Sequence, residues 1–455
     1  MPSSMQPTSR RQFLQSAAMA GGGLLVGFHL PGAARAMAAD AASSTFKPNA
    51  FIRIGTDDVI TLIVGMAEMG QGVLTSLPQL LAEELEADWH KVRVEQAPVA
   101  AAYNNPVFGM QATGGSTSVR ALWDPLRKAG ATAREMLITA AAQTWGVDRA
   151  TCSARAGFVQ HASGKKLSFG ALAAHAATLP APTDAPLKDA KHFTIMGKPL
   201  ARLDTPDKIN GKARFGLDVK LDGLLTAVIA FPPVIGAKLV SFDATRAKAV
   251  AGVKHVVPVA AGVAVIATGY WAAKSARDVL DVKWDTDSKP ELSSDALRAS
   301  MLASLKSPGV PARNDGDVSK ATAATLVEAT YDAPYLAHAC MEPMNCTAAV
   351  GADHIDIWAP TQASGVNRAV LAKIMGVSPE RVSVTTTLLG GGFGRRFAQD
   401  FAIAAAQASK AAGAPVKVVY SREDDIRGQF YRPAAVVQLR GGLDTAGTPL
   451  MFEAK

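Results

Sequence analysis

The first part of the chain alternates apolar and polar residues across a short polar turn. Residues 51–65, FIRIGTDDVITLIVG, have this pattern, which predicts a β-hairpin. Apolar residues then recur at helical spacing over residues 71–86, and KVRVEQ predicts a strand. The stretch RALWDPLRKAGATAREMLITAAAQTWG predicts a long helix, opened by the Gly/Ser/Thr-rich sequence ATGGSTS.

The pattern of apolar and polar residues changes twice after this helix. A polar, proline-spaced segment, ATLPAPTDAPLKDAKH, predicts a linker. Residues 197–289 then combine short strands with one or two helices, which predicts a compact α+β module. After a connection over 290–323, strands and helices alternate again, and LRGGLDTAGTPLMFEAK predicts a strand–turn–strand. We interpret this last stretch as cut within a sheet, which favours a C-terminally truncated chain.

Two parts of the chain repeat one order of elements. Gln71 precedes a helix, the strand KVRVEQ, a glycine-rich turn and a second helix. Gln362 precedes a helix, the strand RVSVTT, the turn GGGFG and a helix. The match is one of pattern more than identity, so an internal duplication and a chance likeness both stay open. The repeated order suggests two glycine-rich turns that face one ligand.

Composition places the chain among globular proteins. It has 455 residues, of which 48% are hydrophobic and 19% charged, enough for about two to four domains. The formal net charge is +8, or about +5 without Arg10, Arg11 and Arg35 of the segment discussed next. No basic run with interleaved aromatics is present, so we expect an anionic small ligand and no nucleic acid.

The N-terminal residues predict export. Ser9-Arg10-Arg11 is followed by Phe13 and Leu14, a weakly hydrophobic Gly/Ala/Leu stretch and an A-x-A site ending at Ala36. This pattern indicates a twin-arginine signal peptide over residues 1–36 and a periplasmic protein. The alternative, a membrane anchor, is disfavoured because the apolar run is short and rich in glycine. Since the twin-arginine pathway carries folded proteins, we expect a cofactor.

Cysteine and histidine usage limits the metal chemistry. Cys152, Cys340 and Cys346 form no C-x-x-C pair, so we expect no iron–sulfur cluster or structural zinc in this chain. Cys340 and Cys346 either pair in an oxidising compartment or, as we favour, stay buried and free. The eight histidines are scattered, with no metal-ligand spacing. Any electrons that leave the protein therefore need another subunit.

The sequence GGGFGRRF has the character of an anion cradle. Glycines let the backbone approach a ligand closely, adopt positive φ and direct consecutive N–H groups at an anion, and a helix directly after them would add its positive end. Arg395 or Arg396 then either meets a phosphate or stays solvated. A nicotinamide site is disfavoured, because Phe397 takes the third glycine position of G-x-G-x-x-G.

Two further turns are similar. In GMAEMGQG, Gln71 either presents its amide to a polar ring edge or simply opens a capped helix. In ATGGSTS, Ser116, Thr117 and Ser118 offer either an N-cap or a phosphate contact at a helix N-terminus. Three such turns point to one large, polar, phosphorylated cofactor.

These stretches resemble a known family. The motifs EMGQGVLTSLPQLLAEEL, TGGSTSVRALWDPLRKAG, PYLAHACMEPMNCTA, APTQ and LLGGGFGRRFAQDF are similar to the molybdopterin-binding large subunit of the xanthine oxidase family, in its exported isoquinoline oxidoreductase or aldehyde dehydrogenase branch. The resemblance covers nearly the whole mature chain. It implies split molybdopterin-binding domains around a hammerhead-like domain, with the following segments: signal 1–36, N-terminal cofactor segment 45–176, linker 177–196, hammerhead-like domain 197–289, connection 290–323, and an incomplete main cofactor domain 324–455.

The resemblance also implies an activity and partners. The family hydroxylates an electron-poor carbon of an aldehyde or an N-heteroaromatic compound with oxygen from water, and its chemistry belongs to the cofactor. In bacterial members this cofactor is commonly molybdopterin cytosine dinucleotide. Electrons pass to a small subunit with two two-iron, two-sulfur clusters and on to an acceptor such as a cytochrome c. The twin-arginine translocase and a cofactor-insertion chaperone are implied as further partners.

Residue roles carry over by matching motif. Gln362 of APTQ is similar to the glutamine that hydrogen-bonds an oxygen on molybdenum. The GGGFGR and MGQG turns and the serine pair resemble cofactor contacts; the matching residues are Gln71, Gly72, Ser116, Ser118, Gly392, Phe393, Gly394 and Arg395.

The sequence departs from the family pattern in two places. Arg395, Arg396 and Phe397 follow the glycines where other members carry a glutamate near the substrate, so a substrate cannot be carried over. The family's catalytic base, a glutamate near the far C-terminus, has no counterpart here, and we expect Glu68 and Glu342 to be structural. Either a longer polypeptide or a second chain completes the site, or the product is a catalytically silent cofactor-binding fragment or scaffold.

Overall fold

The computed structural model describes residues 24–27, 50–287, 293–427 and 430–455. Strands and helices are mixed along these residues, so the predicted α+β class is confirmed. The expected signal peptide, residues 1–36, lies outside the described residues except for 24–27, and it stays a prediction. No helix in the described ranges is both long and apolar enough to cross a membrane.

An N-terminal sheet contains the predicted hairpin. Its strands run in the order β1-β2-β3-β4, with bounds Leu24–Gly27, Ala50–Ile54, Ile60–Val64 and Val92–Gln96. Strands β2 and β3 pair antiparallel, with Ile52 opposite Leu62. The chain then forms α3 (Val73–Leu85) and returns as β4, which lies parallel to β3. This β3-α3-β4 arrangement is a βαβ unit.

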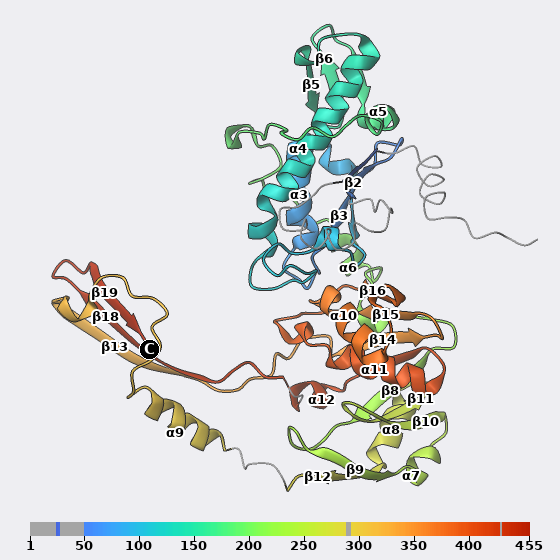
Figure 1. Ribbon diagram of the computed structural model, residues 1–455, viewed down its shortest axis with the longest axis vertical. Coiled ribbons are helices and arrows are strands. Elements are labelled where there is room, and N and C mark those ends of the chain that lie inside the picture. Colours follow the sequence, from blue (N-terminus) through green and yellow to red (C-terminus); the bar gives the residue numbers. More distant parts are fainter. Residues whose placement is uncertain (1–23, 28–49, 288–292, 428–429) are drawn as a thin grey trace, which may run out of the picture.

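The long helix α4 (Ser118–Trp145) packs closely along α3 (Figure 1). At their contact, a Cβ on Gly130 would lie 2.3 Å from the carbonyl oxygen of Leu81, so only glycine lets the backbones approach this far. Beyond α4, a small sheet and a short helix complete this part; they are β5 (Cys152–Arg155), β6 (Phe158–His161), β7 (Lys166–Ser168) and α5 (Phe169–Ala176).

Two buried carboxylates of α3 hold the predicted linker in place. The Glu83 carboxylate accepts hydrogen bonds from the backbone N–H groups of Ile195 (2.6 Å) and Met196 (2.8 Å), and it pairs with the Lys188 ammonium. The neighbouring Glu84 accepts the backbone N–H of Lys188 at 2.9 Å. The segment is therefore docked across α3 and α4 by charge-assisted hydrogen bonds.

The second large sheet mixes distant parts of the chain. Its order is β10-β11-β8-β17-β14-β15-β16. The bounds are Val253–Val259, Gly262–Ala267, Leu225–Ala230, Val416–Val419, Asn345–Val350, Ile355–Ala359 and Val382–Thr386. Strand β8 pairs parallel to β17, with Val416 opposite Leu225. One sheet thus joins segments 197–289 and 324–455, which the sequence pattern describes as separate units.

Helices cover both faces of this sheet around β8 and β11. Alternate residues of β8, such as Ala227 and Ile229, pack with the alanines of α11 (Asp400–Ala412). The intervening Val228 packs with Ala273 of α8 (Tyr270–Asp278). Burial on both faces explains why the sequence GVAVIA of β11 is apolar at every position. The two-stranded pair β9 (Lys238–Asp243) and β12 (Asp281–Asp285) and the short α7 (Thr245–Lys248) lie beside α8.

A second βαβ unit lies in this sheet. After β15 the chain forms α10 (Ser364–Met375) and returns as β16, parallel to β15. The repeated order of elements noticed in the sequence therefore corresponds to two βαβ units, β3-α3-β4 and β15-α10-β16. Whether they arose by duplication stays open.

A third sheet stands away from the rest of the molecule (Figure 1). It consists of β13 (Thr325–Ala333), β18 (Ala435–Leu443) and β19 (Pro449–Ala454), all antiparallel. The predicted strand–turn–strand at residues 439–455 is confirmed by β18 and β19. The connection over 290–323 contains a helix that the sequence analysis did not predict, α9 (Ser294–Ser304).

The docked linker gives a prediction about stability. Replacing Glu83 by Gln removes the buried charge that binds Lys188 and three backbone N–H groups, so the free energy of unfolding should fall by about 3 kcal/mol. Burial alone would raise the pKa of Glu83, but the hydrogen bonds from Lys188 and the backbone hold it below its usual 4.5. The difference between wild type and variant should therefore be full above pH 4.5 and shrink as the pH falls further.

Urea unfolding at pH 7 and at more acidic pH measures this difference. The matched control is Glu95→Gln, which breaks an exposed pair with Arg53 and should cost less than about 1 kcal/mol. Equal losses in the two variants would contradict the role assigned to Glu83.

Candidate functional site

Four loops meet between the two βαβ units. They follow the carboxyl ends of β3, β4, β15 and β16, the ends at which α/β sheets commonly bind ligands. The backbone N–H of Thr113 donates to the carbonyl of Gln362 (2.7 Å), and that of Leu389 donates to the carbonyl of Glu68 (3.0 Å). The glycine-rich turns of the two units therefore do lie together, as their repeated pattern suggests.

The Gln362 side chain joins loops of both units. Its Oε1 accepts the N–H of Gly394 at 3.0 Å, and its Nε2 donates to the carbonyl of Thr113 at 3.0 Å. Only 4% of Gln362 is exposed. One Nε2 hydrogen and one Oε1 lone pair are left after these bonds. The same amide can thus fix the loops and still contact a ligand.

A buried ion pair supports the loop GGGFG from below. The Arg396 guanidinium donates from Nη2 to the Glu342 carboxylate (3.0 Å) and from Nε to the carbonyl of Gly391 (2.7 Å). Glu342 also accepts the N–H groups of Gly390 (3.0 Å) and Leu217 (3.1 Å). Burial lowers the pKa of Arg396, and the charge of Glu342 opposes this shift. Glu342 is structural, as expected.

The loop above this pair presents its backbone amides. The N–H groups of Gly391, Gly392 and Phe393 have no acceptor among the described residues. Left-handed backbone at Gly391 (φ 92°), Phe393 (φ 53°) and Gly394 (φ 98°) turns the chain sharply here. A Cβ on Gly392 would lie 2.5 Å from Met69 Sδ and 2.8 Å from Gln362 Oε1, so a side chain here would displace one of these two side chains. Such a row of free amides is a typical anion site.

The prediction of a helix directly after these glycines was wrong. A single 3₁₀ turn, Arg395–Phe397, follows Gly394, and α11 begins only at Asp400. The Arg395 guanidinium forms two hydrogen bonds with the Asp400 carboxylate (2.9 and 2.8 Å) and lies 5.0 Å from the Phe430 ring. Burial would lower the pKa of Arg395, but the pairing with Asp400 raises it. Arg395 is thus buried and paired with Asp400 rather than solvated, and its contact with a cofactor stays a prediction.

In the MGQG turn, the side chains mainly hold the turn itself. Gln71 accepts the N–H of Met69 (2.8 Å) and donates to the carbonyl of Ala67 (2.9 Å). The Glu68 carboxylate accepts the N–H groups of Gly70 (2.8 Å) and Gly72 (3.0 Å). Glu68 is therefore structural, as expected, and Gln71 keeps one Nε2 hydrogen for a ligand.

The sequence analysis missed the residues that anchor this turn. Arg202 donates to the Gly70 carbonyl (2.9 Å) and to Glu68 (3.1 Å), and it also binds Asp204. Burial would raise the pKa of Asp204, but hydrogen bonds from Arg202 and Lys208 lower it to about 2. No local pattern marks Arg202, because its partner Glu68 lies 134 residues away.

In the ATGGSTS turn, Thr117 is the structural residue. Its hydroxyl donates to the Gly114 carbonyl (2.7 Å) and accepts from Asn105 (2.7 Å). Ser116 is exposed at φ 53°, and Ser118 is the first residue of α4. Within the described ranges, neither serine hydroxyl has a protein partner. Both stay open to a ligand at the N-terminus of a long helix.

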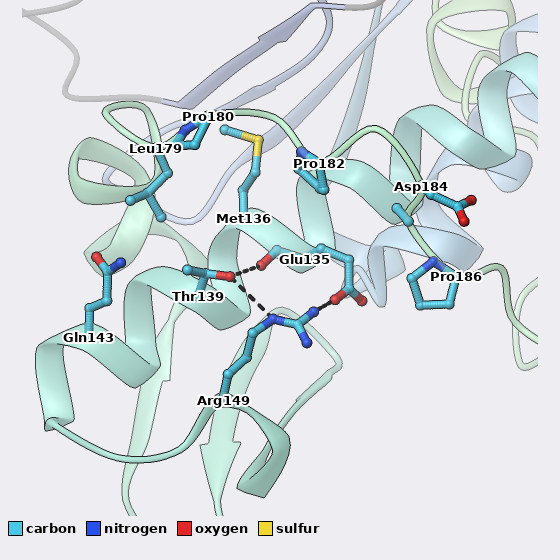
Figure 2. Close-up of a pocket in the computed structure, with 11 residues that line it drawn as sticks. Glu135, Met136, Thr139, Gln143, Arg149, Leu179, Pro180, Pro182, Asp184 and Pro186 are labelled. Atoms are coloured by element: carbon cyan, nitrogen blue, oxygen red, sulfur yellow. Dashed lines mark hydrogen bonds and ion pairs between the residues drawn. The ribbon is translucent and has the colours of Figure 1, made fainter.

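A separate cavity lies away from these loops. Figure 2 shows it between the C-terminal half of α4 and the docked linker, with a volume of about 390 Å³. Arg149 pairs there with Glu135 and contacts Thr139, while Pro180, Pro182 and Pro186 form the opposite wall. None of the predicted site residues lines this cavity. Across the described ranges, no cluster of His, Cys, Asp or Glu could hold a metal ion.

Comparison with known proteins gives consistent matches. Two models described as "Molybdopterin cofactor-binding domain" match residues 7–221 and 306–455. The two matches lie on either side of residues 222–305, in agreement with a split cofactor region. Quinoline 2-oxidoreductase from Pseudomonas putida 86 is a distant structural likeness, with a TM-score of 0.46 and 18% identity over 57% of this chain and 38% of that one.

Two curated relatives span most of the chain. The "Membrane-bound aldehyde dehydrogenase [pyrroloquinoline-quinone]" of Gluconacetobacter polyoxogenes is 34% identical over 96% of this chain and 59% of its own length. The "Isoquinoline 1-oxidoreductase subunit beta" of Brevundimonas diminuta is 31% identical over 90% of this chain and 60% of its own. This chain thus spans about six tenths of these relatives, and it belongs to the xanthine oxidase-type family of molybdopterin-binding large subunits.

Proposed function

We propose that this chain is the cofactor-binding part of a molybdenum hydroxylase that oxidises an aldehyde or an N-heteroaromatic carbon. The observation that supports the proposal most directly is the row of free amides at residues 391–393 beside the Gln362 side chain. A molybdopterin would supply the redox chemistry, in which oxygen from water is added to the substrate carbon. The protein residues would bind and orient it.

The residues present fit such a cofactor. The free amides at residues 391–393 and the open space beside the left-handed Gly70 and Gly72 suit a polar, anionic group close to the backbone. The unpaired hydroxyls of Ser116 and Ser118 suit a phosphate at the N-terminus of α4. We propose the cytosine dinucleotide form, because its pyrophosphate would use more of these donors than a single phosphate.

The proposal includes partners and a compartment. With three free cysteines among the described residues, this part of the chain offers no set of iron–sulfur ligands, so electrons would pass to a separate two-iron, two-sulfur subunit and then to an acceptor such as a cytochrome c. The N-terminal Arg10-Arg11 pattern supports periplasmic export in the folded state by the twin-arginine translocase, after loading by a chaperone.

A catalytically silent cofactor-binding protein is the second candidate. It is favoured because the carboxylates beside the loops are already paired or hydrogen-bonded within the protein. Glu68, Glu342 and Asp400 each bind arginine or several backbone N–H groups, so none is positioned as a free base. A general base is worth about 10²- to 10⁴-fold in rate, and its absence would leave a bound but slow cofactor.

Metal analysis tests the cofactor. Protein purified from its native host should contain close to one molybdenum per chain, with an iron–sulfur subunit among the co-purifying polypeptides. Because the name of one relative includes pyrroloquinoline quinone, the same sample should be extracted and tested for that quinone. Quinone without molybdenum would contradict the proposal, whereas molybdenum with no aldehyde or N-heteroaromatic oxidation would favour the silent alternative.

Removing the serine hydroxyls tests the phosphate contact. The double variant Ser116→Ala, Ser118→Ala should carry less molybdenum per chain, since two donors to the cofactor are lost, while its thermal unfolding stays near that of wild type. Ser241→Ala, an exposed serine on β9, is the control and should keep its metal. If the double variant and the control contain the same amount of molybdenum per chain, Ser116 and Ser118 do not bind the cofactor phosphate.

Replacing Gln362 separates binding from turnover. Gln362→Ala should lower turnover per bound molybdenum by about 10²-fold, as for loss of one preorganised donor, with most of the metal retained. The bonds to Gly394 and Thr113 are lost as well, so oxidation rate and metal content are measured on one preparation. A proportional loss of both would make Gln362 a loop-holding residue only.

A further inference from the structure

Two buried acidic side chains lie beside the MGQG turn of the candidate site. Glu68 is 1% exposed, and its carboxylate accepts the backbone N–H groups of Gly70 (2.8 Å) and Gly72 (3.0 Å). Asp204 is also buried; burial would raise its pKa, but hydrogen bonds from two basic side chains lower it to about 2, so it is ionised at neutral pH. A turn that is expected to contact an anionic cofactor therefore has two negative charges close to it.

The guanidinium of Arg202 lies between these two carboxylates. Its Nη2 donates to Glu68 at 3.1 Å and to Asp204 at 2.8 Å, and its Nε donates to Asp204 at 2.9 Å. The ammonium of Lys208 binds Asp204 at 2.5 Å and lies 4.0 Å from Glu68. The two cations balance the two anions, so the cluster is neutral. Without Arg202 it would carry one excess negative charge.

Arg202 also lies at the open side of the turn. Its Nη1 donates to the carbonyl of Gly70 at 2.9 Å. A Cβ on Gly72 would lie 3.9 Å from Nη1 and Cζ of Arg202, and no other described residue, its chain neighbours aside, comes within 4 Å of it. Met69 of the same turn contacts the loop GGGFG, since its Sδ would lie 2.5 Å from a Cβ on Gly392. The positive charge thus borders open backbone within the candidate site.

The docked linker explains how Arg202 reaches this turn. Glu83 of α3 binds the backbone N–H of Met196, and the chain then continues past the start of the same helix, where the N–H of Leu203 donates to Thr75 Oγ1 at 3.0 Å. Arg202 lies between these two anchors. Segment 197–289, which the sequence analysis assigned to a separate hammerhead-like domain, therefore contributes a side chain to the candidate site.

We propose that Arg202 is a positioning residue of the site, whose charge allows the MGQG turn to accept an anionic part of the cofactor. The proposal rests on the proposed function, because it concerns the same site. An anion beside uncompensated carboxylates is repelled, and the repulsion is stronger near a protein surface than in bulk water. Arg202 removes this repulsion and, through the Gly70 carbonyl, also fixes the course of the turn.

Inorganic pyrophosphate is the probe for this charge effect. Its affinity for the full chain, produced in a host that makes no molybdenum cofactor, is measured by calorimetry at low ionic strength. Arg202→Gln should weaken the Kd at least about tenfold, because one negative charge beside the turn is left uncompensated. Arg202→Lys keeps the positive charge but not the planar fork, and it should bind within about threefold of wild type.

A double variant separates the charge of Arg202 from its part in folding. Arg202→Gln combined with Asp204→Asn restores the charge balance, although the ion pair of Asp204 with Lys208 is lost as well. Its affinity should return to within about threefold of wild type, whereas a purely structural role predicts weaker binding still. Arg277→Gln, which removes the pair of a mostly buried arginine with Asp424, is the control and should bind like wild type. Thermal unfolding shows that each variant is folded.

Molybdenum content gives a second measurement. Protein from the native host should contain less molybdenum per chain in Arg202→Gln than in wild type, and the double variant should regain most of it. Three results would overturn the proposal: wild type does not bind pyrophosphate, Arg202→Gln binds it as tightly as wild type, or the double variant binds no better than Arg202→Gln. Wild type without molybdenum would instead contradict the proposed function, and the pyrophosphate affinities would still decide the role of Arg202.

Discussion

The buried pair of Arg396 and Glu342 is the interaction on which the candidate site depends. Arg396 is fully buried, and its guanidinium binds the carboxylate and the carbonyl of Glu342 as well as the carbonyl of Gly391. Because Arg396 binds the carbonyl of Gly391 and Glu342 binds the N–H of Gly390, the loop is fixed against this buried pair. The N–H groups of residues 391–393 are left without an acceptor among the described residues. Removing either partner would leave an uncompensated charge in the interior, which typically costs several kcal/mol.

This support explains how a glycine-rich loop can be a defined binding surface. Glycine loses more conformational freedom on folding than any other residue, so five loop residues with four glycines are costly to order. The hydrogen bonds of Arg396, Glu342 and Gln362 offset this cost before any ligand binds. The site is thereby preorganised, which increases affinity by reducing the ordering that binding requires.

Local periodicity predicted the hairpin β2-β3, the helices and returning strands of the two βαβ units and the glycine-rich turns, because each of these depends on residues close in sequence. The pairing of β8 with β17 was not predictable, since its partners lie about 190 residues apart and no local pattern records a neighbour. Arg395 and Arg396 illustrate the same limit within the site. The two are adjacent and chemically identical, yet one binds Asp400 and the other lies under the glycines. Only the packing around each side chain distinguishes them.

The bridge from Gln362 to Thr113 has a consequence for biosynthesis. The two residues lie 249 positions apart, and Gly394, the other partner of the amide, comes later still. While a ribosome is still adding the first 390 residues, the N-terminal βαβ unit can fold, but the surface opposite it does not yet exist. Any ligand held by both units can therefore be inserted only after most of the chain has been synthesised, and the order of assembly is fixed by where the loops lie in the sequence.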